Sequence, residues 1–153
     1  MEFRENRAIY LQIADLVCEN ILNGTWKPGQ RIPSIRELAE SIEVNPNTVM
    51  RTFGYLEDQG IIHNQRGIGF FLSENAYEIT RELMKKTFIS RELPQMFRTL
   101  DLLRMGFDDL AGLYAAHRSA EGENPPGTGV PVRPEGRTAA RESNPPARKE
   151  TSV

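Results

Sequence analysis

Residues 34–60 read SIRELAESIEVNPNTVMRTFGYLEDQG, and this stretch decides the fold. It holds two apolar patterns of helical period with only a few residues between them. In the first, Ser34 and Glu37 match the S-x-x-E capping box, in which a hydroxyl and a carboxylate bond backbone amides that a helix start leaves free. In the second, Asn45 is placed to cap the helix, and Pro46 takes its first position, where a missing N–H does no harm. Two short helices joined by a tight turn form a helix-turn-helix.

The residues on both sides of this stretch complete a winged helix. Before it, residues 8–23 carry a broad apolar stripe typical of a further helix. After it, residues 61–64 and 68–72 have strand patterns and are separated by a short turn. Three helices followed by a β-hairpin make a winged helix-turn-helix. We therefore predict an α+β, mainly α fold, with this domain over residues 1–72 and a short helical dimerisation segment after it.

The apolar stripe of the third helix decides which of its side chains point outward. Val49, Phe53 and Leu56 recur at helical spacing and face the core, so the opposite face near the helix start is polar with one cation. Such a face suits a DNA major groove, where Asn pairs with adenine, Arg pairs with guanine and an apolar group touches the thymine methyl. The second helix and the wing tip add groups that can approach the DNA backbone or the minor groove. The predicted DNA-binding residues are Ser34, Arg36, Asn45, Asn47, Thr48, Met50, Arg51, Arg66 and Gly67.

Several of these residues also have a purely structural interpretation. Arg51 could be an ordinary solvated helix residue, Asn45 only a cap, and Gly67 only a turn residue. We predict that His63 is a strand surface residue rather than a metal ligand and that Cys18 lies in or near the core. Winged helices also serve as protein-interaction modules, so the fold alone does not decide the function.

Residues 73–117 are helical in pattern and rich in Leu, Met and Phe. We predict helices over 74–90 and 94–105, with a break at Leu93–Pro94, and a final helix capped by Asp108. These helices are too few to enclose a core of their own, so their apolar faces must pack on the winged helix or on a second copy. The predicted dimerisation residues are Leu83, Phe88, Met96, Phe97, Leu100, Leu103, Phe107 and Leu110.

Composition limits the remaining possibilities. Residues 118–153 contain no aromatic residue, Leu or Ile and six of the ten prolines, so we predict a disordered tail. A net charge of -2 excludes a generally basic coat protein but not a local basic face. The single cysteine excludes an internal disulfide framework and a Cys-rich zinc site. No apolar run approaches the length of a membrane span, so we expect a soluble, cytoplasmic protein without cofactor or metal.

Residues 7–72 resemble the DNA-binding domain of the GntR family of bacterial transcription regulators. The resemblance rests on the order and spacing of the blocks AIYLQI at 8–13, GQRIPSIRELA at 29–39, VNPNTV at 44–49, LEDQGII at 56–62 and RGIGFF at 66–71. The NPNTV sequence, together with the short segment after the wing, is similar to the YtrA subfamily. Other subfamilies carry an effector-binding or aminotransferase-like domain for which we expect no room here.

The resemblance implies a dimer that binds an inverted-repeat operator. Regulators of this subfamily often lie beside, and repress, genes for ABC transporters. Many members of the family have Arg where this sequence has Pro46 and Met50. Base reading is therefore assigned here to Asn47, Thr48, Met50 and Arg51.

The sequence thus predicts a sequence-specific DNA-binding transcription regulator that acts as a dimeric repressor, with duplex DNA and a second copy as partners and no membrane. The alternative is a winged-helix adaptor without DNA binding, which would need a large exposed apolar patch on the face that carries Arg36 and Arg51. An enzyme is not predicted, because no nucleophile–base set or phosphate-binding loop is present. The Asp108-Asp109 pair is better explained by a helix N-terminus.

Overall fold

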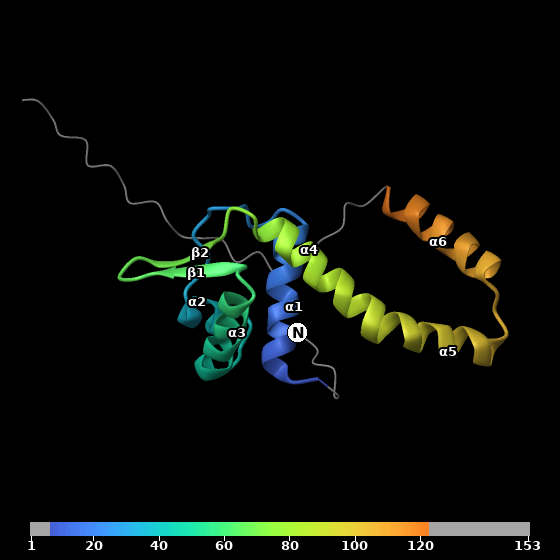
Figure 1. Cartoon of the computed structure of the whole chain (residues 1–153), viewed down its shortest axis with the longest axis horizontal. Helices are drawn as coiled ribbons and strands as arrows, with labels where there is room; N and C mark the ends of the chain where they lie inside the picture. Colours follow the sequence, from blue (N-terminus) through green and yellow to red (C-terminus); the bar gives the residue numbers. More distant parts are fainter. Residues whose placement is uncertain (1–6, 123–153) are drawn as a thin grey trace, which may run out of the picture.

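The structure is a computed structural model that describes residues 7–122. Its elements, in chain order, are α1 (Ile9–Leu22), α2 (Ile35–Ser41), α3 (Pro46–Asp58), β1 (Ile62–Gln65), β2 (Gly69–Leu72), α4 (Ala76–Thr87), the π-helical turn η1 (Phe88–Glu92), α5 (Leu93–Leu103) and α6 (Phe107–Glu121). The first three helices and the hairpin form a head, from which α4 leads into an arm made of η1, α5 and α6 (Figure 1). This mainly helical arrangement with one two-stranded sheet confirms the predicted winged helix-turn-helix.

The core of the head lies where α1, α2 and α3 meet the base of the hairpin. On α3, Val49, Phe53 and Leu56 are all buried, as their spacing predicts. The Phe53 ring meets the Phe70 ring of β2 edge to face, with centroids 4.7 Å apart, so helix and hairpin pack together. Trp26, in the turn after α1, is also buried, and α4 packs along α1. This packing fixes which side of α3 remains exposed.

The wing is the antiparallel hairpin of β1 and β2, and its last residue pair is Gln65 opposite Gly69. The prediction placed the strands over 61–64 and 68–72, so each strand starts one residue later than expected. Gly67 has φ +79° and Gly69 has φ +139°, in the left-handed region that favours glycine. These two glycines confine the reversal to the residues after Gln65, which lets the first strand continue to that point.

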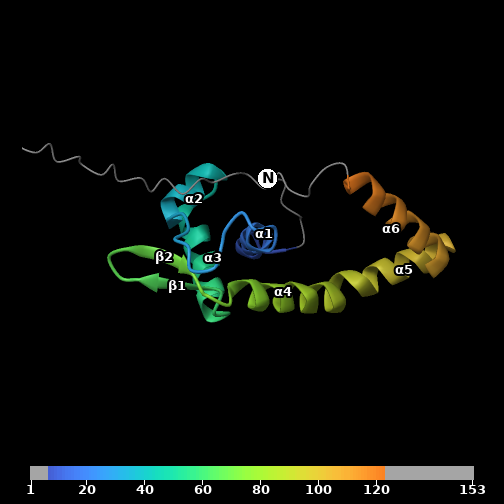
Figure 2. The ribbon, with the colours of Figure 1, turned by 90° about the horizontal axis from the view of Figure 1, so that it is seen from above.

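The predicted break at Leu93–Pro94 is wrong, because α4, η1 and α5 form one continuous rod (Figure 2). In an α-helix the ring of Pro94 would collide with the carbonyl four residues earlier, which is that of Ser90. η1 is a π-helical turn, whose hydrogen bonds span five residues instead of four. The wider turn accommodates the proline, and the Leu93 amide donates a hydrogen bond to the carbonyl of Phe88.

The last helix starts earlier and ends later than predicted. The amide of Gly106 donates a hydrogen bond to Oδ2 of Asp109 at 2.9 Å, so Gly106 and not Asp108 holds the N-cap position. α6 then continues to Glu121, past the boundary expected at residue 117. The rest of the predicted tail, residues 123–153, lies outside the described residues.

α5 and α6 bury none of their residues within the single chain. Figure 2 shows α5 extending away from the head and α6 turning back at its far end. In the described part of the chain, no helix combines the length and the apolar character needed to cross a membrane.

Candidate nucleic-acid interface

The start of α2 is held by the capping box that the sequence predicts. Oγ of Ser34 accepts a hydrogen bond from the Glu37 amide at 3.3 Å, and the Ser34 amide donates to Oε2 of Glu37 at 2.6 Å. The hydrogen bond from this amide lowers the pKa of the Glu37 carboxyl below its ordinary value of 4.5. Arg36, between the two capping residues, is exposed. The cap thus fixes the first turn of α2 and leaves its cation free to reach a ligand.

We predict that Ser34→Ala lowers the free energy of unfolding by about 1 kcal/mol, because one orphan amide loses its acceptor. Glu37→Ala should destabilise the fold at pH 7 and progressively less in acid. The folded state lowers the pKa of this carboxyl, so its contribution is complete above 4.5 and is lost as the pH falls through the lower folded value. Urea unfolding at several pH values measures both effects.

The control for this prediction is Ser41→Ala, at the other end of α2. The Ser41 hydroxyl donates only to the carbonyl of Leu38, at 2.8 Å, and caps no amide. Its loss should change stability by less than about 0.5 kcal/mol. Equal losses for Ser34→Ala and Ser41→Ala would show that the cap contributes nothing special.

The start of α3 is also capped as predicted. Oδ1 of Asn45 accepts a hydrogen bond from the Asn47 amide at 2.8 Å, and Pro46 occupies the first turn. The side chains of Asn47 and Met50 are exposed, whereas Thr48 is half-buried. The outward face of this first turn is therefore polar, with one apolar side chain beside it.

Arg51 is exposed as well, but its guanidinium does not extend freely into solvent. Its Cζ lies 4.0 Å from the centroid of the Tyr10 ring of α1, in a cation–π contact. The sequence offered no reason to pair these two residues, because they lie far apart in the chain and belong to no common periodic pattern.

The wing brings a further cation, Arg66, and Gly67 to an exposed tip. Sequence reasoning missed a second arginine at the wing base. Arg31 pairs with Phe71 in an isolated bridge, and a Cβ on Gly69 would lie only 2.9 Å from its Nε. The glycine therefore makes room for the arginine side chain. The sequence did carry a signal for this arginine. Polar Arg31 is followed by apolar Ile32 in an extended segment before the capped helix, so the two side chains should point to opposite sides.

Three neighbouring elements carry these groups, because α2 packs on α3 and α3 on β1 (Figure 1). We call six exposed side chains of these elements and of the segment before α2 the recognition surface: Arg31, Arg36, Asn47, Met50, Arg51 and Arg66. Four of these six residues are cations. The exposed carboxylates of the same helices are Glu37, whose oxygen accepts from the Ser34 amide, Glu40 near the end of α2, and Glu57 and Asp58 in the last turn of α3. The cations at the helix starts and on the wing suit a polyanion.

Comparison with known proteins identifies the family to which this architecture belongs. Residues 9–72 match the sequence profile of the bacterial regulatory proteins of the gntR family. The HTH-type transcriptional regulator YhcF of Bacillus subtilis is 41% identical over 96 residues, which make up 63% of this chain and 77% of YhcF. The chain belongs to the GntR family. The HTH-type transcriptional repressor YtrA of the same organism is 44% identical over 93 residues, or 61% of this chain and 71% of YtrA.

One solved structure is similar to this GntR regulator over more than its winged domain. A GntR-family protein from Bacteroides thetaiotaomicron superimposes with a TM-score of 0.60 at 40% identity, covering 74% of this chain and 99% of that one. The relatives confirm the resemblance to YtrA that the sequence suggested. They are transcription regulators, which confirms that this GntR chain regulates transcription rather than catalysing a reaction.

Two residues of this GntR regulator that could suggest other chemistry have structural roles. Burial, and then the charges of Asp15 and Glu19, raise the pKa of the Cys18 thiol to about 12, so it is a protonated core residue, as predicted. His63 is an exposed strand residue stacked on Phe71, with ring centroids 6.0 Å apart. Among residues 7–122, no three His, Cys, Asp or Glu side chains gather as a metal site.

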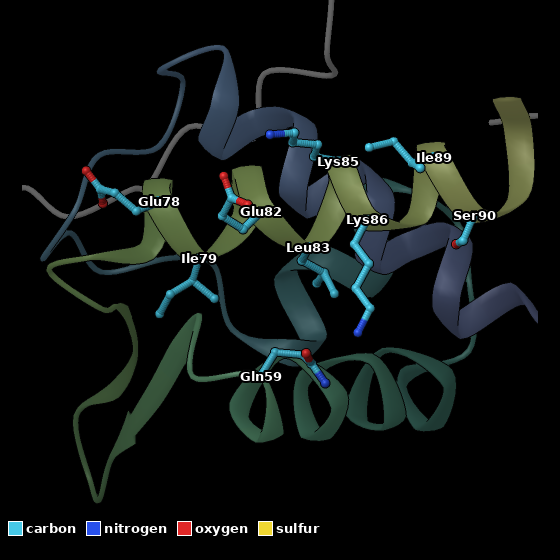
Figure 3. Close-up of a pocket in the computed structure, with 9 residues that line it drawn as sticks. All are labelled: Gln59, Glu78, Ile79, Glu82, Leu83, Lys85, Lys86, Ile89 and Ser90. Atoms are coloured by element: carbon cyan, nitrogen blue, oxygen red, sulfur yellow. The ribbon is translucent and has the colours of Figure 1, made fainter.

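An open groove of about 860 Å³ lies outside the recognition surface, between α4 and the C-terminal end of α3. Figure 3 shows Ile79, Leu83 and Lys86 extending from α4 toward Gln59. Ile89 of η1 continues the apolar lining into the arm. Charged side chains of α4, Glu78, Glu82, Lys85 and Lys86, also line the groove.

Proposed function

We propose that this GntR regulator binds an inverted-repeat operator as a homodimer and represses transcription. The observation that carries the proposal is the conjunction of a cationic recognition surface on the head with an arm in which no residue is fully buried in one chain. The first supplies the contacts to DNA, and the second requires a partner. We also propose the domain organisation expected from the sequence, a DNA-binding domain over 1–72, a helical dimerisation segment from 73 and a tail, with the segment extended to Glu121.

The arm supports the dimer through its exposed apolar side chains. Phe97 is 51% exposed, Leu103 63% and Phe107 79%. An apolar surface of this extent on an isolated chain indicates an interaction site, and a second copy is the partner that closes it by symmetry. The residues proposed for the interface are Leu83, Met96, Leu100 and Leu110, which are half-buried, and Phe88, Phe97, Leu103 and Phe107, which are exposed.

The recognition surface supports operator binding through the geometry of its helices. In a helix-turn-helix the second helix enters the major groove with its N-terminal residues at the base edges. Here those residues are Asn47, Met50 and Arg51 of α3. Thr48, which the sequence assigned to base reading, is half-buried, and we propose for it a contact to the DNA backbone beside the groove. The predicted contacts of Ser34, Arg36 and Asn45 also go to that backbone, and Arg66 and Gly67 reach it from the wing. A two-fold dimer presents two such surfaces, so its operator is an inverted repeat.

The adaptor alternative finds less support on this surface. On α2, α3 and the wing, the exposed large apolar side chains among the described residues are Met50 and Ile68. One of them is on the helix and the other on the wing tip, and two such side chains do not make the large patch that a protein partner requires. The exposed apolar surface lies on the arm instead.

Repression is proposed because YtrA, which is 44% identical, is a transcriptional repressor. The resemblance to its subfamily makes genes for ABC transporters the first targets to examine. The test is sequencing of the genomic DNA fragments that the purified chain captures, followed by a reporter driven by the captured promoter. An enriched palindrome and a reporter that rises when the regulator is deleted support the proposal. Capture without a motif contradicts it.

We predict that Arg66→Ala weakens binding to every duplex by a similar factor, because a wing-tip cation contacts backbone and carries no sequence information. The slope of log affinity against log salt should fall by about one for each subunit. Fluorescence anisotropy over a salt series measures both. Arg81→Ala, which removes an exposed cation of α4 outside the recognition surface, should leave the slope unchanged. A slope that Arg66→Ala does not alter would remove the wing from the interface.

A further inference from the structure

Tyr10, in the first turn of α1, holds α3 at three points. Cζ of Arg51 lies 4.0 Å from the centroid of its ring. Its carbonyl oxygen accepts a hydrogen bond from Oγ1 of Thr52 at 2.8 Å. Its ring also meets that of Tyr55 edge to face, with centroids 6.3 Å apart. Since the three partners lie within two turns of α3, the Tyr10 ring has a fixed position relative to the recognition helix.

This contact leaves the hydrogen-bonding edge of Arg51 available. Among residues 7–122, Arg51 forms no ion pair with a carboxylate. An aromatic ring attracts a guanidinium through its face, so the N–H donors, which lie in the guanidinium plane, are not consumed. A planar fork of this kind matches O6 and N7 of guanine. The ring therefore restricts the orientation of the guanidinium without occupying the groups that read a base.

Restriction of this kind favours binding. An arginine on an exposed helix face samples many rotamers and loses that freedom when it pairs with a base, whereas one already stacked on a ring has less freedom to lose. A fixed plane also narrows the set of base edges that the fork can meet. The contact should therefore raise both affinity and selectivity at one base pair.

We propose that Tyr10 is a positioning residue for Arg51, so that base preference at one position of each half-site depends on a side chain of α1 outside the helix-turn-helix. The proposal rests on the operator binding proposed above. The opposite role, in which the ring withholds Arg51 from DNA, predicts tighter binding when the ring is removed.

The test uses the full chain and, as the probe, duplexes that the wild-type chain selects from a random-sequence library. Tyr10→Leu should lower affinity for the selected duplex roughly tenfold and flatten the preference at one base pair of each half-site. Tyr10→Phe, which keeps the ring face, should bind within about twofold of wild type. The double variant Tyr10→Leu/Arg51→Ala should be no weaker than Arg51→Ala alone, because both changes remove one interaction.

The matched control is Tyr55→Leu, which removes one of the three contacts of Tyr10 but leaves its hydrogen bond from Thr52 and its contact with Arg51 in place. It should retain the selected base preference even where it lowers the midpoint of thermal unfolding. Thermal unfolding of each variant distinguishes a loss of folding from a loss of base recognition. Should Tyr10→Leu unfold, Tyr10→Met replaces it, since its flexible side chain fills similar space.

Several outcomes would overturn the positioning role. Tyr10→Leu could bind with wild-type affinity and base preference, or more tightly, or Tyr10→Phe could lose as much as Tyr10→Leu. An Arg51→Ala variant with an unchanged base preference would show that Arg51 reads no base, while leaving operator binding intact. A wild-type chain that selects no sequence at all would instead contradict the proposed function.

Discussion

Phe97→Glu should convert the regulator from a dimer to a monomer and weaken operator binding by about 100-fold or more. Phe97 is half exposed in the single chain and lies on the apolar face of α5 with Met96 and Leu100. A carboxylate placed there would have to be desolvated without a partner when two arms associate. A monomer binds one half-site only, and the loss of the linked second site removes an avidity factor of about 10² to 10⁴.

The arm offers a matched control five residues further along α5. Leu102 is 84% exposed, and at about 100° per residue it points away from the face that carries Phe97 and Leu100. Leu102→Glu therefore adds the same charge to the same helix outside the proposed interface and should leave the dimer intact. Sedimentation equilibrium and operator titration of the two variants decide the matter. A dimeric Phe97→Glu, or two variants that dissociate alike, would contradict this arm interface.

The head could be predicted from sequence because its signals are local. The capping box at Ser34, the Asn45-Pro46 start and the stripe of Val49 with Phe53 are each set by residues within one or two turns, and each is found where expected. Local hydrogen bonds and helical period leave few alternatives at such positions. The predicted exposure of Asn47 follows from the same stripe.

The arm was harder to predict, because a proline is usually a helix breaker. Pro94 at the start of α5 predicts a break, but a single π-helical turn over Phe88–Glu92 accommodates its ring and the helix continues. The end of α6 was placed too early, since the sequence around residue 117 loses its apolar periodicity without losing its helical structure.

Contacts between distant residues were out of reach for a different reason. Tyr10 meets Arg51, and Arg31 lies against Gly69, only after the chain has folded. Neither pair has a fixed spacing that a periodic pattern could reveal. The exposure of Asn47, Met50 and Arg51 could thus be predicted from one helix, whereas the side chains that contact the arginines could not.

Asn47→Ala should produce a large and base-specific loss of operator affinity. A bidentate pair of asparagine with adenine contributes about 1–3 kcal/mol of discrimination, and the dimer makes the contact twice. The total of about 2–6 kcal/mol corresponds to a loss of at least about 25-fold. Binding to unrelated duplex DNA, which depends on phosphate contacts, should be unchanged. Anisotropy titrations with operator and unrelated duplexes measure the two affinities.

Asn45→Ala is the matched control for Asn47→Ala, because Asn45 lies two residues earlier and caps the helix. Its Oδ1 accepts from the Asn47 amide at 2.8 Å, so its loss should lower the free energy of unfolding by about 1 kcal/mol. Asn47→Ala removes a side chain for which no hydrogen bond is observed within residues 7–122, and stability should hardly change. The two variants should therefore separate folding from reading at one helix start. If Asn47→Ala weakened operator and unrelated DNA equally, the asparagine would contact backbone only, and base reading would fall to Met50 and Arg51.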